Sequence, residues 1–272
     1  MIANARMYSV TPEVAGLWRA LLSAVIDRAG LSITVLEHPE PAPIDELWAR
    51  PDQAAVFMCG LPYSRSKPRP VLIAAPVPSP ADFDSQPRYW SELVVRADSN
   101  YHSIEDTFGR RIAFTVADSQ SGCLAALSYL MAMGGSDPLY REVIAPQITP
   151  LGVMDAVIRG IADVAPVDSY AFCLLQRYRP DLTAKLRVVA RTAHTPIPPI
   201  VASNPGLDSL QAALLEAHHI ASIQPLMATL MLQSFVHPDP ASYDVLQLRS
   251  DVARQYWRQH PLATVVHPAF AQ

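Results

Sequence analysis

The sequence predicts an α/β protein with a mostly parallel sheet, organised in two lobes. Short apolar runs typical of buried strands alternate along the chain with helical patterns, and polar residues follow several strand ends. The residues at these strand exits are Tyr8-Ser9, Gly60–Tyr63, Ser119–Gly122 and Asp168. Ligands in such sheets bind beyond the carboxyl ends of the strands, so these residues are the candidate site. We find no internal repeat.

The first half of the chain contains a clear helix start at Thr11-Pro12-Glu13, where a hydroxyl residue precedes proline and an acid. Apolar residues then recur at helical spacing until Gly30. Further helices are expected at 44–49 and 103–108. Strands are expected at 5–10, 33–36, 54–58, 71–75 and 90–96.

The second half begins with a strand at 112–117, a hydroxyl-rich loop and a helix at 123–133 that Gly134 closes. The remaining strands are expected at 143–145, 162–167, 186–190 and 200–202. The remaining helices are expected at 153–159, 169–177, 208–219, 225–235 and 239–259.

Composition narrows the possible functions. The chain has 272 residues, 50% of them hydrophobic, which is enough for one large domain or two lobes with their own cores. The net charge is −4 and no Lys/Arg-rich run occurs, which argues against nucleic acid as a partner. No apolar run reaches the length of a membrane span. Cys59, Cys123 and Cys173 have no metal-ligand spacing, so we expect buried free thiols, a state that fits a reducing compartment without establishing one.

The loop Ser119-Gln-Ser-Gly122 is the most informative segment. A strand, a short loop and a helix direct serine hydroxyls and free backbone N–H groups at one point, where the helix dipole favours an anion. No lysine or arginine lies in the loop, so neutral donors hold the anion. This arrangement favours reversible binding over catalysis.

Three segments together resemble a known family: Tyr89-Trp-Ser-Glu-Leu-Val-Val-Arg-Ala-Asp-Ser99, then Ser119-Gln-Ser-Gly122, then Gly160-Ile-Ala-Asp-Val-Ala-Pro-Val-Asp168. In order and spacing they are similar to the phosphate/phosphite/phosphonate substrate-binding proteins of ABC transporters, which have the type 2 periplasmic binding protein fold. The similarity covers roughly residues 5–250.

This resemblance implies an α/β fold of two lobes joined by two crossing hinge strands, with the ligand trapped between the lobes. Lobe one is expected at 1–90 plus 195–272, and lobe two at 91–194. The partners implied are a small phosphonate- or phosphate-like anion and an ABC permease. Tyr63 comes from its strand exit and the other expected ligand-binding residues from the family motif; the full set is Tyr8, Tyr63, Tyr89, Ser91, Ser119, Gln120, Ser121, Gly122 and Asp168.

The sequence also departs from the family pattern. Related members carry a Gly-x-His-x-x-Ser segment before the helix at 153–159, whereas this chain has Ile148-Thr-Pro-Leu-Gly-Val153. A polar pair before the Cys-Gly turn is replaced by Phe57-Met58. Both changes remove hydrogen-bonding groups, so we expect a ligand more apolar than a simple phosphonate, or degenerate binding.

Two alternatives stay open: an enzyme of the cofactor-biosynthesis type on the same scaffold, and a cytoplasmic metabolite-sensing module. No catalytic motif is present, so we expect no enzyme, no cofactor and no metal. The first residues, Met1 to Arg6, lack a charged segment followed by an apolar core. We therefore expect no signal peptide in this sequence, and either a cytoplasmic protein or a periplasmic one whose precursor was trimmed.

Overall fold

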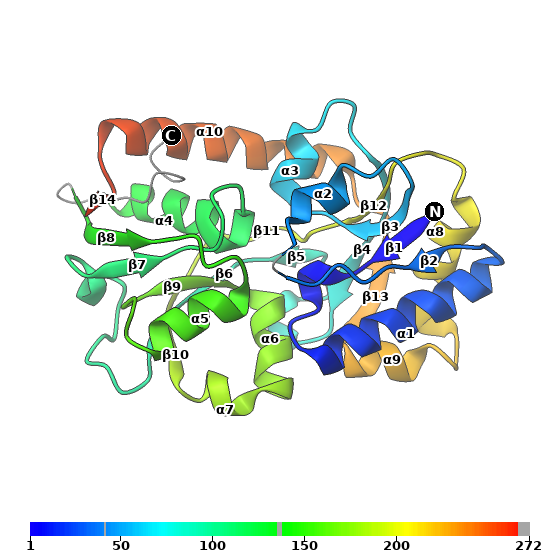
Figure 1. Cartoon of the computed structure of the whole chain (residues 1–272), viewed down its shortest axis with the longest axis horizontal. Helices are drawn as coiled ribbons and strands as arrows, with labels where there is room; N and C mark the ends of the chain where they lie inside the picture. Colours follow the sequence, from blue (N-terminus) through cyan, green and yellow to red (C-terminus); the bar gives the residue numbers. More distant parts are fainter. Residues whose placement is uncertain (41, 135–137, 266–272) are drawn as a thin grey trace. The chain divides into compact units, whose positions relative to one another are not determined.

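The computed structural model describes residues 1–40, 42–134 and 138–265 (Figure 1). These residues divide into two compact units. Unit 1 consists of Met1–Arg88 and Pro196–Asp244, and unit 2 consists of Tyr89–Thr195 and the residues from Val245 onward.

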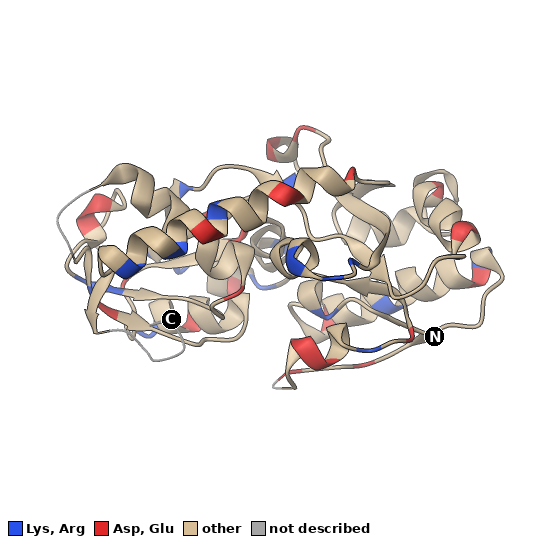
Figure 2. Ribbon diagram, turned by 90° about the horizontal axis from the view of Figure 1, so that it is seen from above, with Lys and Arg blue, Asp and Glu red and all other residues tan. Residues whose placement is uncertain are grey.

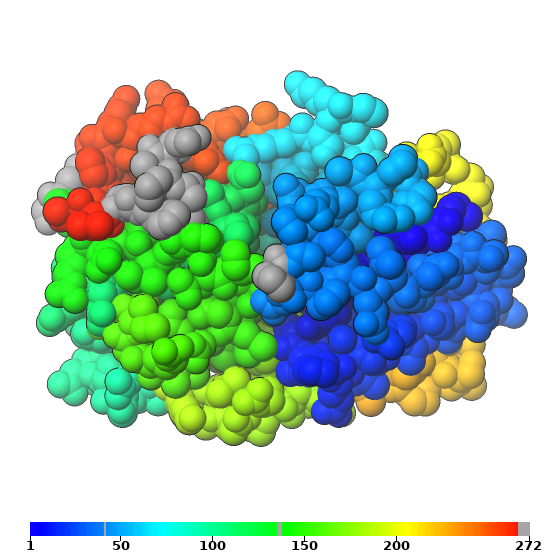
Figure 3. Space-filling view, in the orientation of Figure 1, coloured from blue at the N-terminus to red at the C-terminus, as the bar shows by residue number. Residues whose placement is uncertain are grey.

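The chain passes between the units in two short strands, β5 (Arg88–Tyr89) and β11 (Thr195–Pro196), which form a two-stranded sheet. A third passage lies at the start of α10 (Asp244–Gln259). Each unit is therefore made from two separate stretches of the chain. The N-terminal 40 residues, blue in Figure 3, contribute a continuous part of the viewed face of unit 1.

Unit 1 contains a six-stranded sheet of order β13-β4-β12-β3-β1-β2. Its strands are β1 (Ile2–Asn4), β2 (Thr34–Val35), β3 (Gln53–Phe57), β4 (Val71–Pro78), β12 (Ile200–Ala202) and β13 (Leu232–Val236). Only β1 pairs in parallel, with β2 and β3, while β12 and β13 pair antiparallel to their neighbours. The expectation of a mostly parallel sheet is therefore wrong for this unit, because strands that return late in the chain are inserted in the opposite direction.

The helices of unit 1 are α1 (Pro12–Ala29), α2 (Ile44–Trp48), α3 (Gly60–Arg65), α8 (Asp208–Leu215) and α9 (Gln224–Thr229). Short 3-10 turns lie at Arg6–Tyr8, Ala81–Phe83, Ala217–His219 and Pro240–Tyr243. The helix expected at 225–235 ends early, and β13 occupies its second half. Leu232 and Phe235 are three residues apart, a spacing that also fits a helix, but both are buried by pairing with β4.

Helix α1 confirms the strongest local prediction. The Thr11 side chain accepts the Val14 N–H at 3.1 Å, and Gly30 ends the helix in the left-handed conformation with φ of 69°. Val14, Trp18 and Leu21 are completely buried. The helix is therefore defined by its caps and by one apolar face.

Gly16 lies on the exposed side of α1, where an added Cβ would meet no atom within 4 Å. Because glycine is disfavoured inside a helix, we expect Gly16→Ala to raise the free energy of unfolding by about 0.5–1 kcal/mol in urea denaturation. The matched control is Gly152→Ala in α5 (Pro150–Ile158), where a Cβ would lie 2.0 Å from the Gln147 carbonyl oxygen. That variant should lose stability, and equal effects of the two substitutions would contradict this account.

Unit 2 contains two three-stranded sheets. In the first, β6 (Ser91–Arg96) pairs antiparallel with β9 (Ala165–Asp168) and β10 (Leu186–Arg191). In the second, β8 (Tyr140–Ile144) pairs in parallel with β7 (Arg111–Ala113) and β14 (Ala263–Val265). A parallel bridge between Ile112 and Val164 connects the two sheets, so the strands follow one another as β14-β8-β7-β9-β6-β10.

This strand order repeats the topology of unit 1. The series β8-β7-β9-β6-β10 corresponds to β2-β1-β3-β12-β4, with three parallel strands followed by antiparallel ones in each case. The sequence shows no repeat, yet each unit places the carboxyl ends of its central parallel strands at one sheet edge. In unit 2 that edge follows β7 and β9, and it carries Ser119–Gly122 and Asp168.

The remaining elements of unit 2 are α4 (Ala125–Met133), α5, α6 (Ser169–Tyr178), α7 (Pro180–Thr183), α10, a 3-10 turn at Glu105–Thr107 and a π-helical turn, η4, at Gln120–Leu124. Its core includes Ile112, Phe114 and Val164, all completely buried.

The C-terminal segment groups with unit 2, whereas the division expected from the sequence placed residues 195–272 together. Helix α10 lies beside α4 (Figure 1), and Trp257 Nε1 donates to the Leu127 carbonyl at 3.0 Å. Strand β14 follows α10 and adds to the sheet next to β8. These contacts join residues that are far apart in the sequence, so no local sequence pattern predicts them.

Candidate functional site

The turn at Ser119 lies between a strand that ends before its expected position and a helix that begins before its expected position. Strand β7 ends at Ala113 rather than at Ala117, and η4 then runs directly into α4. Ser119 is the N-cap, and its Oγ accepts the Gly122 N–H at 2.9 Å. The N–H groups of Gln120 and Ser121 lie in the first turn, where the helix has no carbonyl for them. The end of this helix is therefore suited to an anion.

Gly122 allows this turn to close. A Cβ at this position would lie 1.9 Å from Thr115 Oγ1 and 2.8 Å from Ser119 Oγ. The Thr115 N–H also donates to the Gly122 carbonyl at 3.1 Å. The loop after β7 thus packs directly on the helix terminus, and only glycine fits at this contact.

Ser121, Ser91 and Asp168 form one hydrogen-bonded group beside the turn. Ser121 Oγ donates to Asp168 Oδ2 at 3.2 Å, and Ser91 Oγ donates to the Ser121 carbonyl at 2.7 Å. Ser91 and Asp168 are direct partners in the β6–β9 pairing. The structure therefore brings together, within unit 2, five expected site residues that are spread over 78 positions of the sequence: Ser91, Ser119, Ser121, Gly122 and Asp168.

Asp168 also caps a helix. Its Oδ1 accepts the N–H groups of Tyr170 and Ala171, both at 2.9 Å, at the start of α6. The side chain therefore serves as a structural cap and as the partner of Ser121 at the same time. Gln120, the remaining member of the turn, is buried at 3% exposure.

Burial raises the pKa of Asp168 to about 6 from its ordinary 3.8, although its hydrogen bonds from Ala171, Ser121 and Tyr170 act in the opposite direction. The folded state therefore binds this proton more tightly than the unfolded state. We expect the stability contributed by the protonated carboxyl to be complete below pH 3.8 and to fall by about 3 kcal/mol as the pH rises to about 6.

Urea denaturation across this pH window measures the effect. Asp168→Asn keeps an oxygen for the two backbone N–H groups but does not titrate, so its stability should not show this fall. Identical pH profiles for the variant and the unsubstituted protein would contradict the assignment to Asp168.

The three expected tyrosines are all buried and lie in different surroundings. Tyr8 packs in unit 1 against Phe57, edge to face, with ring centroids 5.2 Å apart. Tyr63, in α3, contacts Tyr243 at 5.1 Å. Tyr89 lies in β5 and is completely buried. Their packing accounts for their burial; a ligand contact for any of them stays a prediction.

Arg254 is a charged neighbour of the turn that sequence reasoning did not identify. From α10 it donates to Asp118 Oδ1 at 2.8 Å and to the Ala117 carbonyl at 3.0 Å. It thus brings a positive charge to the loop that contains no basic residue of its own. Figure 2 shows residues of both charges along α10. A separation of 136 residues leaves no local pattern that could have indicated this contact.

The positions that depart from the family pattern have structural roles here. The Thr149 side chain caps α5 by accepting the Gly152 N–H at 3.1 Å. Phe57 and Met58 are buried at 1% and 4% exposure. Residues 148–153 therefore contribute to helix capping, and Phe57 and Met58 contribute to core packing.

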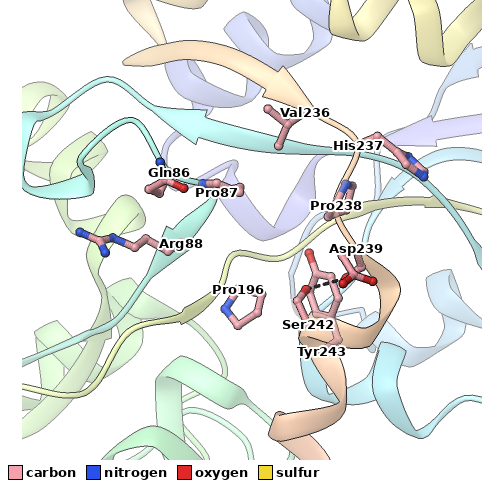
Figure 4. Close-up of a pocket in the computed structure, with 10 residues that line it drawn as sticks. All are labelled: Gln86, Pro87, Arg88, Pro196, Val236, His237, Pro238, Asp239, Ser242 and Tyr243. Carbon is pink, nitrogen blue, oxygen red and sulfur yellow. Dashed lines mark hydrogen bonds between the residues drawn. The ribbon is translucent and has the colours of Figure 1, made fainter.

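Two pockets lie away from the turn. The first, of about 350 Å³ in unit 1, is shown in Figure 4, where Pro196 lies beside Ser242 and Tyr243, and Gln86 and Pro87 lie above it. Its polar groups serve local structure: Ser242 Oγ donates to the Asp239 carbonyl, and the Tyr243 hydroxyl donates to Ile197. No expected site residue lines this pocket among the residues that the structure describes.

The second pocket, of about 470 Å³, lies in unit 2 at the sheet edge opposite the Ser119 turn, where β7 begins and β6 ends. Arg111 and Asp163 are ion-paired at 3.1 Å, and Arg96 and Asp98 at 2.5 Å. Four of the charged groups on its wall are therefore paired, whereas Arg110, which also lines the pocket, has no ion pair with the residues that the structure describes.

Within residues 1–40, 42–134 and 138–265, no three or more His, Cys, Asp or Glu side chains are grouped so that they could hold a metal ion. In the same part of the chain, no helix combines the length and the apolar character that crossing a membrane requires. Cys59 and Cys123 are buried free thiols, whereas Cys173 is half-buried.

Comparison with known proteins gives a family match over most of the chain. Residues 55–243 match the family described as "ABC transporter, phosphonate, periplasmic substrate-binding protein". A curated relative, the membrane-bound lytic murein transglycosylase F of Erwinia tasmaniensis, is 28% identical over 231 residues. The match covers 82% of this chain but 41% of the transglycosylase, so the chain spans less than half of that protein's length.

Solved structures show the same fold. A binding-protein component of an ABC phosphonate transporter from Pseudomonas aeruginosa superposes with a TM-score of 0.74 at 18% identity, covering 93% of this chain and 88% of that one. PhnD1 from Prochlorococcus marinus, solved with methylphosphonate, superposes with a TM-score of 0.74 at 15% identity, covering 92% and 96%. These likenesses confirm the expected α/β fold of the type 2 periplasmic binding proteins.

Proposed function

The chain belongs to the family of periplasmic substrate-binding proteins of phosphonate ABC transporters, and from that premise we propose that it binds a small phosphonate-like oxyanion at the Ser119–Gly122 turn. The single observation that carries the proposal is this turn. It combines a helix terminus, a serine N-cap and a second serine within one loop.

The binding energy comes from neutral donors. Hydrogen bonds to a charged group contribute about 1.5–3 kcal/mol each, so the N–H groups of the first helical turn and one or two hydroxyls support a reversible complex. Arg254 adds a positive charge near the turn, and its pairing with Asp118 neutralises the nearest acid on the loop. This chemistry binds an anion reversibly, in keeping with a family of binding proteins.

The two units correspond in this proposal to the two lobes expected from the sequence. Tyr8, Tyr63 and Tyr89 then supply contacts to the organic part of the ligand, and an ABC permease is the partner that receives it. The loss of polar groups at Phe57-Met58 and at 148–153 supports a ligand with an apolar substituent.

Isothermal titration calorimetry with methylphosphonate, phenylphosphonate, phosphate and sulfate tests the proposal. We expect a phosphonate to bind with one site per chain. At 100 times its Kd the ligand should add about 2.7 kcal/mol of stability in thermal unfolding. If none of the four anions binds, or if binding is unchanged when Ser119 and Ser121 are replaced, the proposed function is wrong.

A further inference from the structure

The Ser121 hydroxyl has one proton, and the structure shows that its acceptor is Asp168. A serine hydroxyl donates one hydrogen bond and accepts up to two. Because an ionised carboxylate can only accept, Ser121 Oγ donates its proton to Asp168 Oδ2 when Asp168 is charged, at 3.2 Å. In that state Ser121 offers only lone pairs to a ligand at the turn. It cannot then act as a donor to a fully ionised oxyanion.

Asp168 is held in place beside the serine. Its Oδ1 is held by the N–H groups of Tyr170 and Ala171, and its residue exposure is 7%. The neighbouring Ser91 hydroxyl is also committed, to the Ser121 carbonyl. These contacts hold the carboxylate against Ser121.

Most of the other ionisable groups on the elements that pack against β9 are paired or neutral. Those in ion pairs are Glu92–Arg191 beside β6, Asp163–Arg111 beside β7, and Asp155–Arg159 on α5. Helix α6 also carries Cys173, Arg177 and Tyr178. Burial raises the pKa of Cys123 in η4 and of Tyr170 in α6, so both are neutral at neutral pH. Arg254, the cation beside the turn, is paired with Asp118. An anion at the turn therefore meets the charge of Asp168 through one hydroxyl.

Two arrangements satisfy all the hydrogen bonds. In one, Asp168 is ionised, Ser121 donates to it, and the ligand donates its own P–OH proton to Ser121 Oγ. In the other, Asp168 is protonated and donates to Ser121, which donates to the ligand. Each arrangement contains one proton more than the state in which Asp168 and the ligand are both fully ionised. Only bonds to that proton form or break. The raised pKa of Asp168, about 6, keeps the second arrangement accessible near neutral pH.

We infer that the Ser121–Asp168 pair makes one proton part of the bound complex, so that the turn selects oxyanions that can carry a proton, such as alkylphosphonates, over sulfate. This inference rests on the proposed function, since it assigns the ligand chemistry of the same turn. Asp168 acts here through Ser121 and is a positioning residue that determines specificity.

Calorimetry in two buffers with different ionisation enthalpies measures the proton directly. At a pH above the second pKa of methylphosphonate, we expect binding to take up about one proton from the buffer. Sulfate, which carries no proton at that pH, should bind at least about tenfold more weakly, because the proton must then be taken up by Asp168.

The variant Asp168→Asn distinguishes this role of Asp168 from a purely structural one. The asparagine oxygen can still accept from Tyr170 and Ala171, while its NH₂ group donates to Ser121 Oγ and frees the serine proton for the ligand. We expect sulfate affinity to rise at least about tenfold and proton uptake to disappear. The matched control, Asp155→Asn, removes an exposed carboxylate of α5 and should leave both quantities unchanged.

The possible outcomes distinguish a failure of this inference from a failure of the proposed function. Methylphosphonate binding without proton uptake overturns this inference and leaves the proposed function standing. Equal affinities for sulfate and methylphosphonate in the unsubstituted protein also overturn it, and neither measurement depends on the folding of a variant. Failure of every oxyanion to bind overturns the proposed function and this inference together.

Discussion

Replacing Gly122 with alanine is expected to abolish anion binding and to lower the free energy of unfolding by about 3 kcal/mol. The added Cβ would lie 1.9 Å from Thr115 Oγ1 and 2.8 Å from both Thr115 Cγ2 and Ser119 Oγ. Because the Thr115 backbone is tied to the Gly122 carbonyl, the side chain cannot yield without moving the turn. Urea denaturation and calorimetry with methylphosphonate measure the two effects.

A second substitution identifies the cause. Thr115→Ala removes two of the three atoms that the new Cβ meets, so Gly122→Ala combined with Thr115→Ala should recover a large part of the lost stability. Additive losses in the double variant would show that the Thr115 contact is not the reason for glycine at this position. Wild-type stability and affinity in Gly122→Ala alone would contradict the packing of the turn itself.

Replacing Ser119 and Ser121 together with alanine is expected to weaken methylphosphonate binding by at least about 100-fold, because two hydrogen bonds to a charged ligand are lost. The loss of the N-cap hydroxyl should also cost about 1 kcal/mol of stability, which leaves the protein folded. Ser242→Ala, in the pocket of Figure 4, is the matched control and should bind as the unsubstituted protein does.

Circular dichroism checks that the double variant is folded, and calorimetry measures its affinity. A folded double variant that binds methylphosphonate as tightly as the unsubstituted protein would remove the Ser119 turn from the binding site.

Local signals in the sequence predicted the elements whose ends are determined by neighbouring residues. Thr11-Pro12 and Gly30 mark the two ends of α1, because capping depends on residues within three positions of the helix end. The strand–turn–helix at Ser119 was predicted for the same reason, although β7 ends four residues early and the helix starts as a π turn. The candidate anion site was therefore largely visible in the sequence.

Other features depend on partners far along the chain. Leu232–Val236 has a spacing that fits a helix, and pairing with β4, about 155 residues earlier, makes it a strand. The hydrogen bond from Ser121 to Asp168 depends on the β6–β9 register, and the contact of Arg254 with Asp118 depends on the packing of α10. No periodicity or motif encodes such contacts, so the sequence indicated the site residues but not how they share one proton.

The most direct test of the central claim is to locate the bound oxyanion by NMR. In ¹⁵N-labelled protein titrated with methylphosphonate, we expect the backbone amide signals of Gln120 and Ser121 to show the largest shifts, because those N–H groups would donate to the anion. The amides of His237 and Ser242, in the pocket of Figure 4, should shift much less. Saturable shifts at His237 and Ser242 with none at Gln120 and Ser121 would contradict the assignment of the site.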